Sequence, residues 1–93
     1  MVVTAARSVT VLGSTGSVGR STVDLIARDR ERFPVEALVA GRNLDLLVEQ
    51  AKLLRPRLAV IADPAMHHAL KDALAGSGTE TGAGPEAVVE AAS

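Results

Sequence analysis

The most informative stretch of this 93-residue sequence reads Leu12-Gly13-Ser14-Thr15-Gly16-Ser17-Val18-Gly19-Arg20. It follows a short apolar run at residues 9–12 and opens a run with helical spacing at residues 18–26. Backbone N–H groups at a strand-to-helix turn, together with the positive end of the helix, form a natural binding place for phosphate. The spacing Gly-x-x-Gly-x-x-Gly is a variant of the dinucleotide-binding fingerprint. We therefore expect a strand, a phosphate-binding turn and a helix.

Each glycine of this motif has an expected role. Gly13 allows the tight turn, Gly16 allows the pyrophosphate to approach the backbone, and Gly19 allows the helix to pack closely on the strand. Thr15 and Ser17 add hydroxyl donors. The plainer interpretation is that the glycines only make a tight turn, and the strand-to-helix context favours the phosphate-binding one.

A P-loop is the other phosphate-binding motif to consider. It requires four residues between its glycines, followed by Lys and then Ser or Thr. Gly19-Arg20-Ser21 imitates its end, but position 14 is Ser and position 20 is Arg. Two mismatches among four key positions exclude this motif.

The rest of the chain alternates short apolar runs with helical spacing. Residues 9–12, 35–39 and 58–62 are predicted strands, and apolar residues recur with helical spacing over 18–26, 44–54 and 66–74. Asn43 and Asp63 are predicted helix N-caps, Pro64 a first helical residue, and Gly76 a left-handed residue after the third helix. The order β-α-β-α-β-α predicts an α/β fold, a Rossmann-like parallel sheet with helices on both faces.

Both ends of the sequence give weaker signals. Residues 1–8 are expected to be a frayed lead-in to the first strand. Residues 77–84 are small and polar where a fourth strand would be expected, so this strand is predicted to be weak and the sheet incomplete. Residues 85–92 are predicted to form a short helix.

Composition excludes several classes of protein. The chain is 47% hydrophobic with one Phe, no Tyr and no Trp, which argues against modules that stack bases on aromatic rings. A net charge of −1 provides no field for nucleic acid or anionic lipid. The absence of Cys excludes disulfides and thiolate catalysis and suits the reducing cytoplasm. No apolar run approaches the ~18–20 residues of a membrane helix.

The end of the second predicted strand distinguishes between nicotinamide cofactors. An acidic residue there binds the ribose 2′-OH of NAD, whereas a basic residue accommodates the 2′-phosphate of NADP. The chain has Gly41, Arg42 and Asn43 at this point. Arg42 offers a forked donor, Asn43 a further donor, and Gly41 room for close approach. We therefore expect NADP rather than NAD, although Arg42 as a solvated charge and Asn43 as a simple cap is the alternative.

No catalytic constellation is predicted from the sequence. His67 and His68 are adjacent, so they lie about 100° apart on a helix and cannot share a metal. The sequence also offers no nucleophile–base pair and no carboxylate cluster.

Three blocks of sequence, at residues 9–26, 33–43 and 56–60, resemble 1-deoxy-D-xylulose 5-phosphate reductoisomerase. The likeness extends in order over about residues 8–75. It implies an NADPH-dependent enzyme of non-mevalonate isoprenoid biosynthesis, which converts 1-deoxy-D-xylulose 5-phosphate to 2-C-methyl-D-erythritol 4-phosphate with a divalent metal (Mg or Mn). It also implies a sugar phosphate substrate, a homodimer and a cytoplasmic location. The cofactor-binding residues that it implies are Thr15, Gly16, Ser17, Val18, Gly41, Arg42 and Asn43.

The sequence departs from this family in what it lacks. The family's Asn-Lys-Glu-Ser segment, acidic metal ligands and substrate-phosphate residues all follow the region where this sequence ends. We therefore expect residues 1–93 to be the N-terminal portion of an NADPH-binding Rossmann-like domain, without the catalytic and C-terminal domains and inactive alone. A stand-alone NADP-binding or sensor module and a non-binding α/β fragment are the alternatives.

Overall fold

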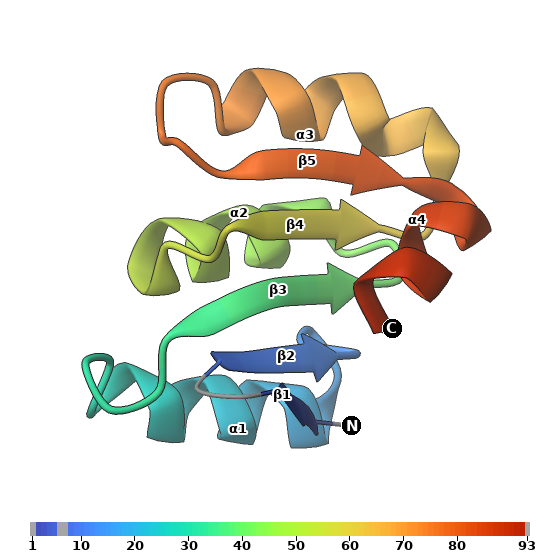
Figure 1. Ribbon diagram of the computed structural model, residues 1–93. Helices are drawn as coiled ribbons and strands as arrows, with labels where there is room; N and C mark the ends of the chain where they lie inside the picture. The colour runs from blue at the N-terminus through green and yellow to red at the C-terminus, as the bar shows by residue number, and fades with distance from the viewer. Residues whose placement is uncertain (1, 6–7, 93) are drawn as a thin grey trace.

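The computed structural model describes residues 2–5 and 8–92, with side chains from residue 8 onward. Four strands and four helices follow one another after a short N-terminal strand (Figure 1). The elements are β1 (Val2–Ala5), β2 (Ser8–Leu12), α1 (Ser17–Ala27), β3 (Val35–Ala40), α2 (Leu44–Leu54), β4 (Leu58–Ile61), the 3-10 turn η1 (Pro64–Met66), α3 (His67–Ala73), β5 (Glu80–Ala83) and α4 (Gly84–Ala92).

The strands form one sheet in the order β1-β2-β3-β4-β5. Strands β2 to β5 are parallel, with Val11 opposite Leu38 and Leu38 opposite Ala59. The predicted β-α-β-α-β-α order and parallel sheet are confirmed. Because parallel strands all point the same way, the loops that follow them meet at one edge, the carboxyl edge of the sheet.

Helices cover both faces of the sheet. Helices α1, α2 and α3 share one core with alternate strand residues, and α4 packs on the opposite face. A Cβ added to Gly82 would lie 3.3 Å from the Ala87 side chain of α4 and 3.6 Å from Val60. In Figure 1, α4 crosses in front of the arrowheads whereas α2 runs behind β4. The buried core residues are Val9, Val11, Val23, Ile26, Leu38, Ala40, Leu47, Ala51, Leu54, Ala59, Ile61, Leu70 and Leu74.

The helix boundaries follow the predicted capping residues. The Oδ1 atom of Asn43 accepts a hydrogen bond from the N–H of Leu46 at 3.2 Å, which caps α2. Asp63 caps η1 and Pro64 takes its first position. Gly76 has φ +80° and follows α3 as predicted. Helix α2 ends at Leu54, and its C-cap is Arg55, a non-glycine residue at φ +50° in the left-handed region.

The N-terminal segment forms a strand rather than the predicted frayed lead-in. Residues 2–5 pair antiparallel with β2, and Val2 lies opposite Val11. An edge strand presents unpaired N–H and C=O groups, and pairing satisfies them. Residues 1, 6 and 7 of the predicted lead-in lie outside the described residues.

Strand β5 forms although its sequence is small and polar. The N–H of Glu80 donates to the carbonyl of Arg57 at 2.8 Å, and Ala83 packs against the core. On the face of the sheet, the Arg57 guanidinium pairs with Glu36 and, at 3.1 Å, with Glu80. The hydrogen bond and the charge of Glu36 raise the pKa of Arg57 above its usual value. Backbone pairing and this ion-pair cluster stabilise a strand that lacks large apolar residues.

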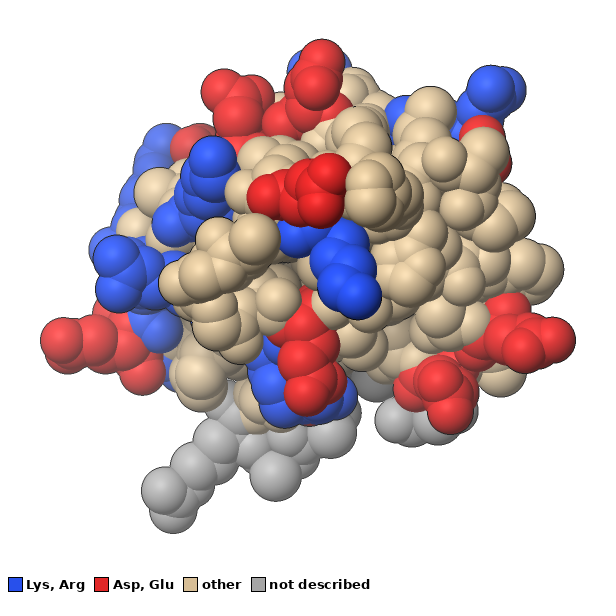
Figure 2. All heavy atoms as spheres, turned by 90° about the horizontal axis from the view of Figure 1, so that it is seen from above, with Lys and Arg blue, Asp and Glu red and all other residues tan. Residues whose placement is uncertain are grey.

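Charged side chains are distributed unevenly around the sheet. Most Lys and Arg side chains visible in Figure 2 lie to the left, the side of the amino ends of the parallel strands, and acidic side chains lie among them. The opposite side carries fewer basic groups in this view.

Candidate functional site

The glycine-rich turn leaves the carboxyl end of β2 and is anchored to the neighbouring strand. The N–H groups of Gly13 and Ser14 both donate to the carbonyl of Val39, at 2.8 and 2.9 Å. Gly13 has φ +72°, which L side chains rarely adopt, and Gly16 donates back to its carbonyl at 3.0 Å. The predicted tight turn at Gly13 is confirmed.

Gly19 lies where helix α1 meets the turn. A Cβ added there would lie 1.9 Å from the carbonyl oxygen of Gly13 and 2.7 Å from the Cα of Ser14. Both atoms belong to the backbone, so no side-chain rotation relieves the overlap. Gly19 therefore allows close packing as predicted, although α1 packs here on the turn that follows β2 and not on the strand itself.

Gly16 has no comparable structural constraint. A Cβ there would make only an ordinary contact, 3.5 Å from the Gly13 carbonyl. Its φ of −75° and ψ of 171° are open to any residue. The fold of the described chain therefore does not require glycine at this position.

The N-terminus of α1 carries hydrogen-bond donors without a protein cap. Its first N–H groups have no acceptor within the helix, the N-cap Gly16 provides no side chain, and the first turn holds no acidic residue. Ser17 is exposed, Val18 is 72% exposed and Thr15 is half-buried. The partial positive charge of the helix end therefore faces an open surface that an anion can reach.

The residues after β3 lie at the same edge. The carbonyl of Gly41 accepts from the N–H of Asp63 at 3.3 Å, and a Cβ at Gly41 would contact nothing within 4 Å. The Arg42 side chain is 80% exposed, and its Nε lies 3.4 Å from Asp63 Oδ2. This contact uses one of five guanidinium donors and leaves the terminal nitrogens for a ligand. Asn43 uses its Oδ1 as a cap, so its Nδ2 group is the part available to an anion.

The structure thus brings the glycine-rich turn and residues 41–43 together at the carboxyl edge of two adjacent strands. Strands β2 and β3 pair directly, and the turn is hydrogen-bonded to Val39 of β3. Open clefts at this edge are the usual ligand sites of parallel α/β sheets. The residues so placed are Thr15, Gly16, Ser17, Val18, Gly41, Arg42 and Asn43.

Two residues at this edge were missed from the sequence. Asp63 was predicted only as a cap, and it also pairs with Arg42. Gln50 lies on the buried side of α2 and donates from Nε2 to the Ser14 carbonyl at 2.8 Å. Its position three residues after Leu47, on the apolar stripe of the helix, was the available signal, since buried polar side chains need partners.

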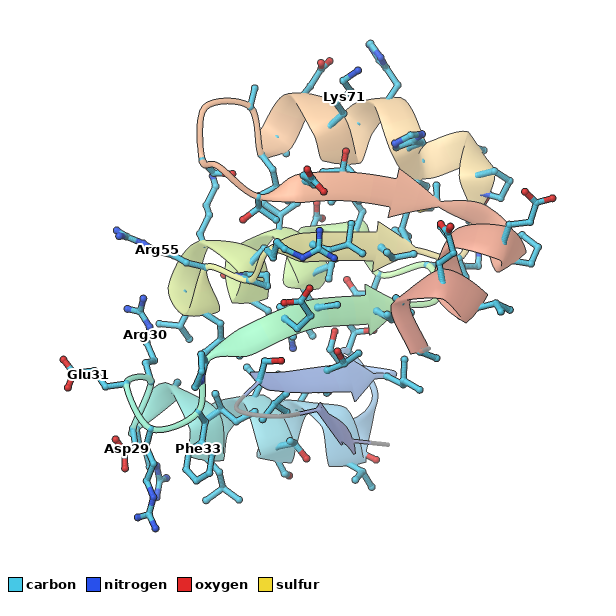
Figure 3. The ribbon with its side chains drawn as sticks, in the orientation of Figure 1. Asp29, Arg30, Glu31, Phe33, Arg55 and Lys71 are labelled. Carbon is cyan, nitrogen blue, oxygen red and sulfur yellow. The ribbon has the colours of Figure 1, made fainter. Side chains whose placement is uncertain are left out.

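A hollow of about 630 Å³ lies at the other end of the molecule. Figure 3 shows Asp29, Arg30, Glu31 and Arg55 at the amino ends of the strands, away from the arrowheads. The hollow therefore lies at the amino edge of the sheet, opposite to the carboxyl edge where parallel α/β sheets bind nucleotides. We therefore place the candidate site at the glycine-rich turn and not at this hollow.

The described residues do not fit a divalent metal. Within residues 2–5 and 8–92, no group of three or more His, Cys, Asp or Glu side chains is close enough to hold one. His67 and His68 are both exposed, and His68 lies 3.2 Å from Asp72, its neighbour one turn along α3.

Within the part of the chain that the structure describes, no helix is long and apolar enough to cross a membrane.

Residues 9–93 match the family model for 1-deoxy-D-xylulose 5-phosphate reductoisomerase. The chain is 62% identical to the reductoisomerase of Rhodospirillum centenum over 86 residues, which cover 92% of this chain and 21% of the relative. It is 55% identical to that of Zymomonas mobilis over 86 residues, which cover 92% of this chain and 22% of the relative. The chain thus spans about a fifth of the length of these curated relatives.

Solved structures agree with this match. The Zymomonas mobilis reductoisomerase in complex with NADPH superimposes with a TM-score of 0.89 at 53% identity, covering 94% of this chain and 23% of that one. A reductoisomerase in complex with NADPH, fosmidomycin and magnesium gives a TM-score of 0.83 at 29% identity, covering 91% and 21%. The fold, the glycine-rich turn and these matches agree, and the chain belongs to the 1-deoxy-D-xylulose 5-phosphate reductoisomerase family.

Proposed function

We propose that this chain binds NADPH at the carboxyl edge of β2 and β3. One observation carries the proposal: the uncapped start of α1 and the exposed Arg42 lie at the ends of adjacent paired strands. The first is suited to the pyrophosphate and the second to the 2′-phosphate of the same cofactor. Two relatives of known structure are described as complexes with NADPH, which supports the choice of ligand.

Each group at the edge has a distinct part in binding. The backbone N–H groups of Thr15, Ser17 and Val18 donate to the pyrophosphate oxygens, and Gly16 lets the phosphates come close. Arg42 and the Nδ2 group of Asn43 hold the 2′-phosphate. Bound NADPH supplies a hydride.

We further propose that residues 1–93 are the N-terminal portion of the NADPH-binding domain of a cytoplasmic reductoisomerase. The whole protein would convert 1-deoxy-D-xylulose 5-phosphate to 2-C-methyl-D-erythritol 4-phosphate as a homodimer that uses Mg²⁺ or Mn²⁺. The family membership supports this proposal, and a relative solved with magnesium supports the metal. The described residues hold no metal group, so we expect the metal ligands to lie outside them and this chain alone to be inactive.

A stand-alone NADP-binding or sensor module is the second candidate. The lack of a metal group within the described residues favours it, since binding without catalysis needs only the cofactor edge. The gene sequence beyond the codon for Ser93 separates the two candidates. An in-frame Asn-Lys-Glu-Ser segment with acidic ligands would exclude the sensor, and a stop codon would exclude the longer enzyme.

Titration calorimetry of this chain with NADPH and with NADH tests cofactor binding. We expect NADPH to bind more tightly than NADH. Failure of both nucleotides to bind would refute the proposed site. Equal affinity for both would refute the role of Arg42 while leaving the turn as a pyrophosphate site.

Replacing Gly16 with Val is expected to preserve the fold and block binding. The backbone at this position accepts any residue, and loss of a glycine N-cap costs about 1 kcal/mol. The new side chain would occupy the surface that the pyrophosphate approaches, so NADPH affinity should fall by at least about tenfold, or 1.4 kcal/mol. Calorimetry measures the NADPH affinity, and urea unfolding measures the stability of the fold. Ala73→Val, at an exposed position of α3, is the matched control; it should leave NADPH affinity unchanged and lower stability by only about 0.5 kcal/mol.

Replacing Asn43 with Asp separates helix capping from cofactor binding. An Asp carboxylate still accepts the hydrogen bond from Leu46, so the urea midpoint should stay near that of the wild type. It loses the Nδ2 donor and adds a negative charge beside the 2′-phosphate, so NADPH affinity should fall by about tenfold. NADH affinity, measured in parallel, should not fall, because an acidic residue at this point can bind the ribose 2′-OH. If NADPH bound to the variant as tightly as to the wild type, Asn43 would be only a cap.

A further inference from the structure

Gln50 makes an unusual contact for a residue of the helical core. It is 5% exposed and lies on the same side of α2 as Leu47 and Leu54, both buried. Burying a carboxamide among aliphatic side chains costs free energy unless its polar atoms are bonded. Its Nε2 group donates to the carbonyl of Ser14, at 2.8 Å, from a helix 36 residues further along the chain.

This bond helps to hold one residue of the glycine-rich turn, Ser14, from both sides. Ser14 is fully buried, and its N–H donates to Val39 of β3 at 2.9 Å. Its carbonyl accepts from Gln50 of α2. The strand β3 and the helix α2 therefore both hold Ser14 by hydrogen bonds.

The geometry of the peptide bond carries this effect to the surface. The Ser14 carbonyl and the Thr15 N–H belong to one planar unit, and the described chain has no cis peptide bond. In a trans peptide the C=O and N–H point in opposite directions. Because Gln50 draws the carbonyl into the core, the N–H of Thr15 must point outward, toward the open side of the turn.

We propose that Gln50 is the positioning residue that sets the orientation of the phosphate-binding turn, and in particular of the Thr15 N–H donor. This inference rests on the proposed function, since Gln50 would orient the turn for the proposed NADPH site. Gln50 does not touch the cofactor; it acts through Ser14. Among the described residues, Gln50 Oε1 and Ser14 Oγ have no hydrogen-bond partner. The bond from Nε2 is therefore the one hydrogen bond by which the Gln50 side chain holds Ser14, and one substitution removes it.

Gln50→Met tests the proposal, because it keeps the length of the side chain and removes the donor. Hydrogen exchange of the ligand-free chain, followed by NMR, should show the Ser14 N–H exchanging about tenfold faster relative to core amides such as Val60. NADPH and NADH affinities should fall by the same factor, about 2- to 10-fold, because the pyrophosphate is common to both. An unchanged NADPH-to-NADH ratio distinguishes this effect from loss of Arg42.

Leu47→Ala is the matched control, since Leu47 is buried on the same helix and its loss weakens the core without removing a turn contact. It should speed exchange of core amides and of Ser14 together. If Gln50→Met gave this same pattern, or left Ser14 protected, the proposal would be overturned. Gln50→Asn, which withdraws the donor by one methylene, replaces Gln50→Met if that variant does not fold. Unfolding of both variants would show Gln50 to be a determinant of the fold instead.

The two proposals fail separately. If the wild-type chain bound neither nucleotide, the cofactor site would be refuted. The exchange of Ser14 in the ligand-free variants would still decide whether Gln50 holds the turn.

Discussion

Replacing Gly19 with Ala is expected to destabilise the chain by about 3 kcal/mol or more, at the upper end of the cost of overpacking. The added methyl group would overlap the Gly13 carbonyl oxygen at 1.9 Å and the Ser14 Cα at 2.7 Å. Relief requires α1 to move away from the turn, which would break the packing of Val23 and Ile26 in the core. Small domains have only about 5–15 kcal/mol of stability in total. Urea unfolding followed by circular dichroism should show a large loss, or no folded state.

Gly41→Ala is the control for this experiment. A Cβ at Gly41 meets nothing within 4 Å, so the urea midpoint should remain close to that of the wild type. A Gly19→Ala chain as stable as Gly41→Ala would show that α1 does not pack on the turn as described.

Replacing Arg42 with Ala is expected to weaken NADPH binding by about tenfold to a hundredfold and to leave NADH binding unchanged. Hydrogen bonds to charged groups contribute about 1.5–3 kcal/mol, and only NADPH carries the 2′-phosphate. The loss of fold stability should be small, because the Arg42 side chain of the ion pair with Asp63 is 80% exposed. Calorimetric titration with both nucleotides measures the selectivity directly.

Arg30→Ala removes the same charge at the opposite end of the sheet, where Figure 3 places Arg30. It should leave both affinities unchanged at moderate ionic strength, since exposed charges farther apart than about 10 Å are screened. Arg42→Lys keeps a positive charge and should recover part of the selectivity. Equal losses of NADPH and NADH in Arg42→Ala would contradict contact with the 2′-phosphate.

Local signals in the sequence were sufficient for most of the fold. The glycine spacing predicted the turn, and Asn43 and Asp63 predicted where helical structure begins, because capping depends on residues close in the chain. The run at residues 9–12 predicted β2, whose parallel neighbours then follow from the alternation of strands and helices.

Contacts between distant residues could not be predicted in the same way. Strand β5 depends on pairing with β4 and on the contact of Arg57 with Glu80, neither of which has a local pattern. The bond from Gln50 to Ser14 joins residues 36 positions apart. The placement of Arg42 beside the turn was expected from the fold class, whereas its contact with Asp63 required the structure.

The antiparallel course of β1 has a practical consequence for any extended form of this chain. Because β1 runs against β2, Val2 lies beside Val11, near the end of β2 from which the turn departs. Helix α4 starts directly after β5 and contacts β2 and β3, and Figure 1 places both chain ends on the arrowhead side of the sheet. Polypeptide joined before Val2 or after Ala92, whether a further domain or a purification tag, therefore starts on the same side of the sheet as the turn. We therefore expect a fluorophore attached at either point to respond to a nucleotide bound at the proposed site, and a bulky tag to hinder its binding.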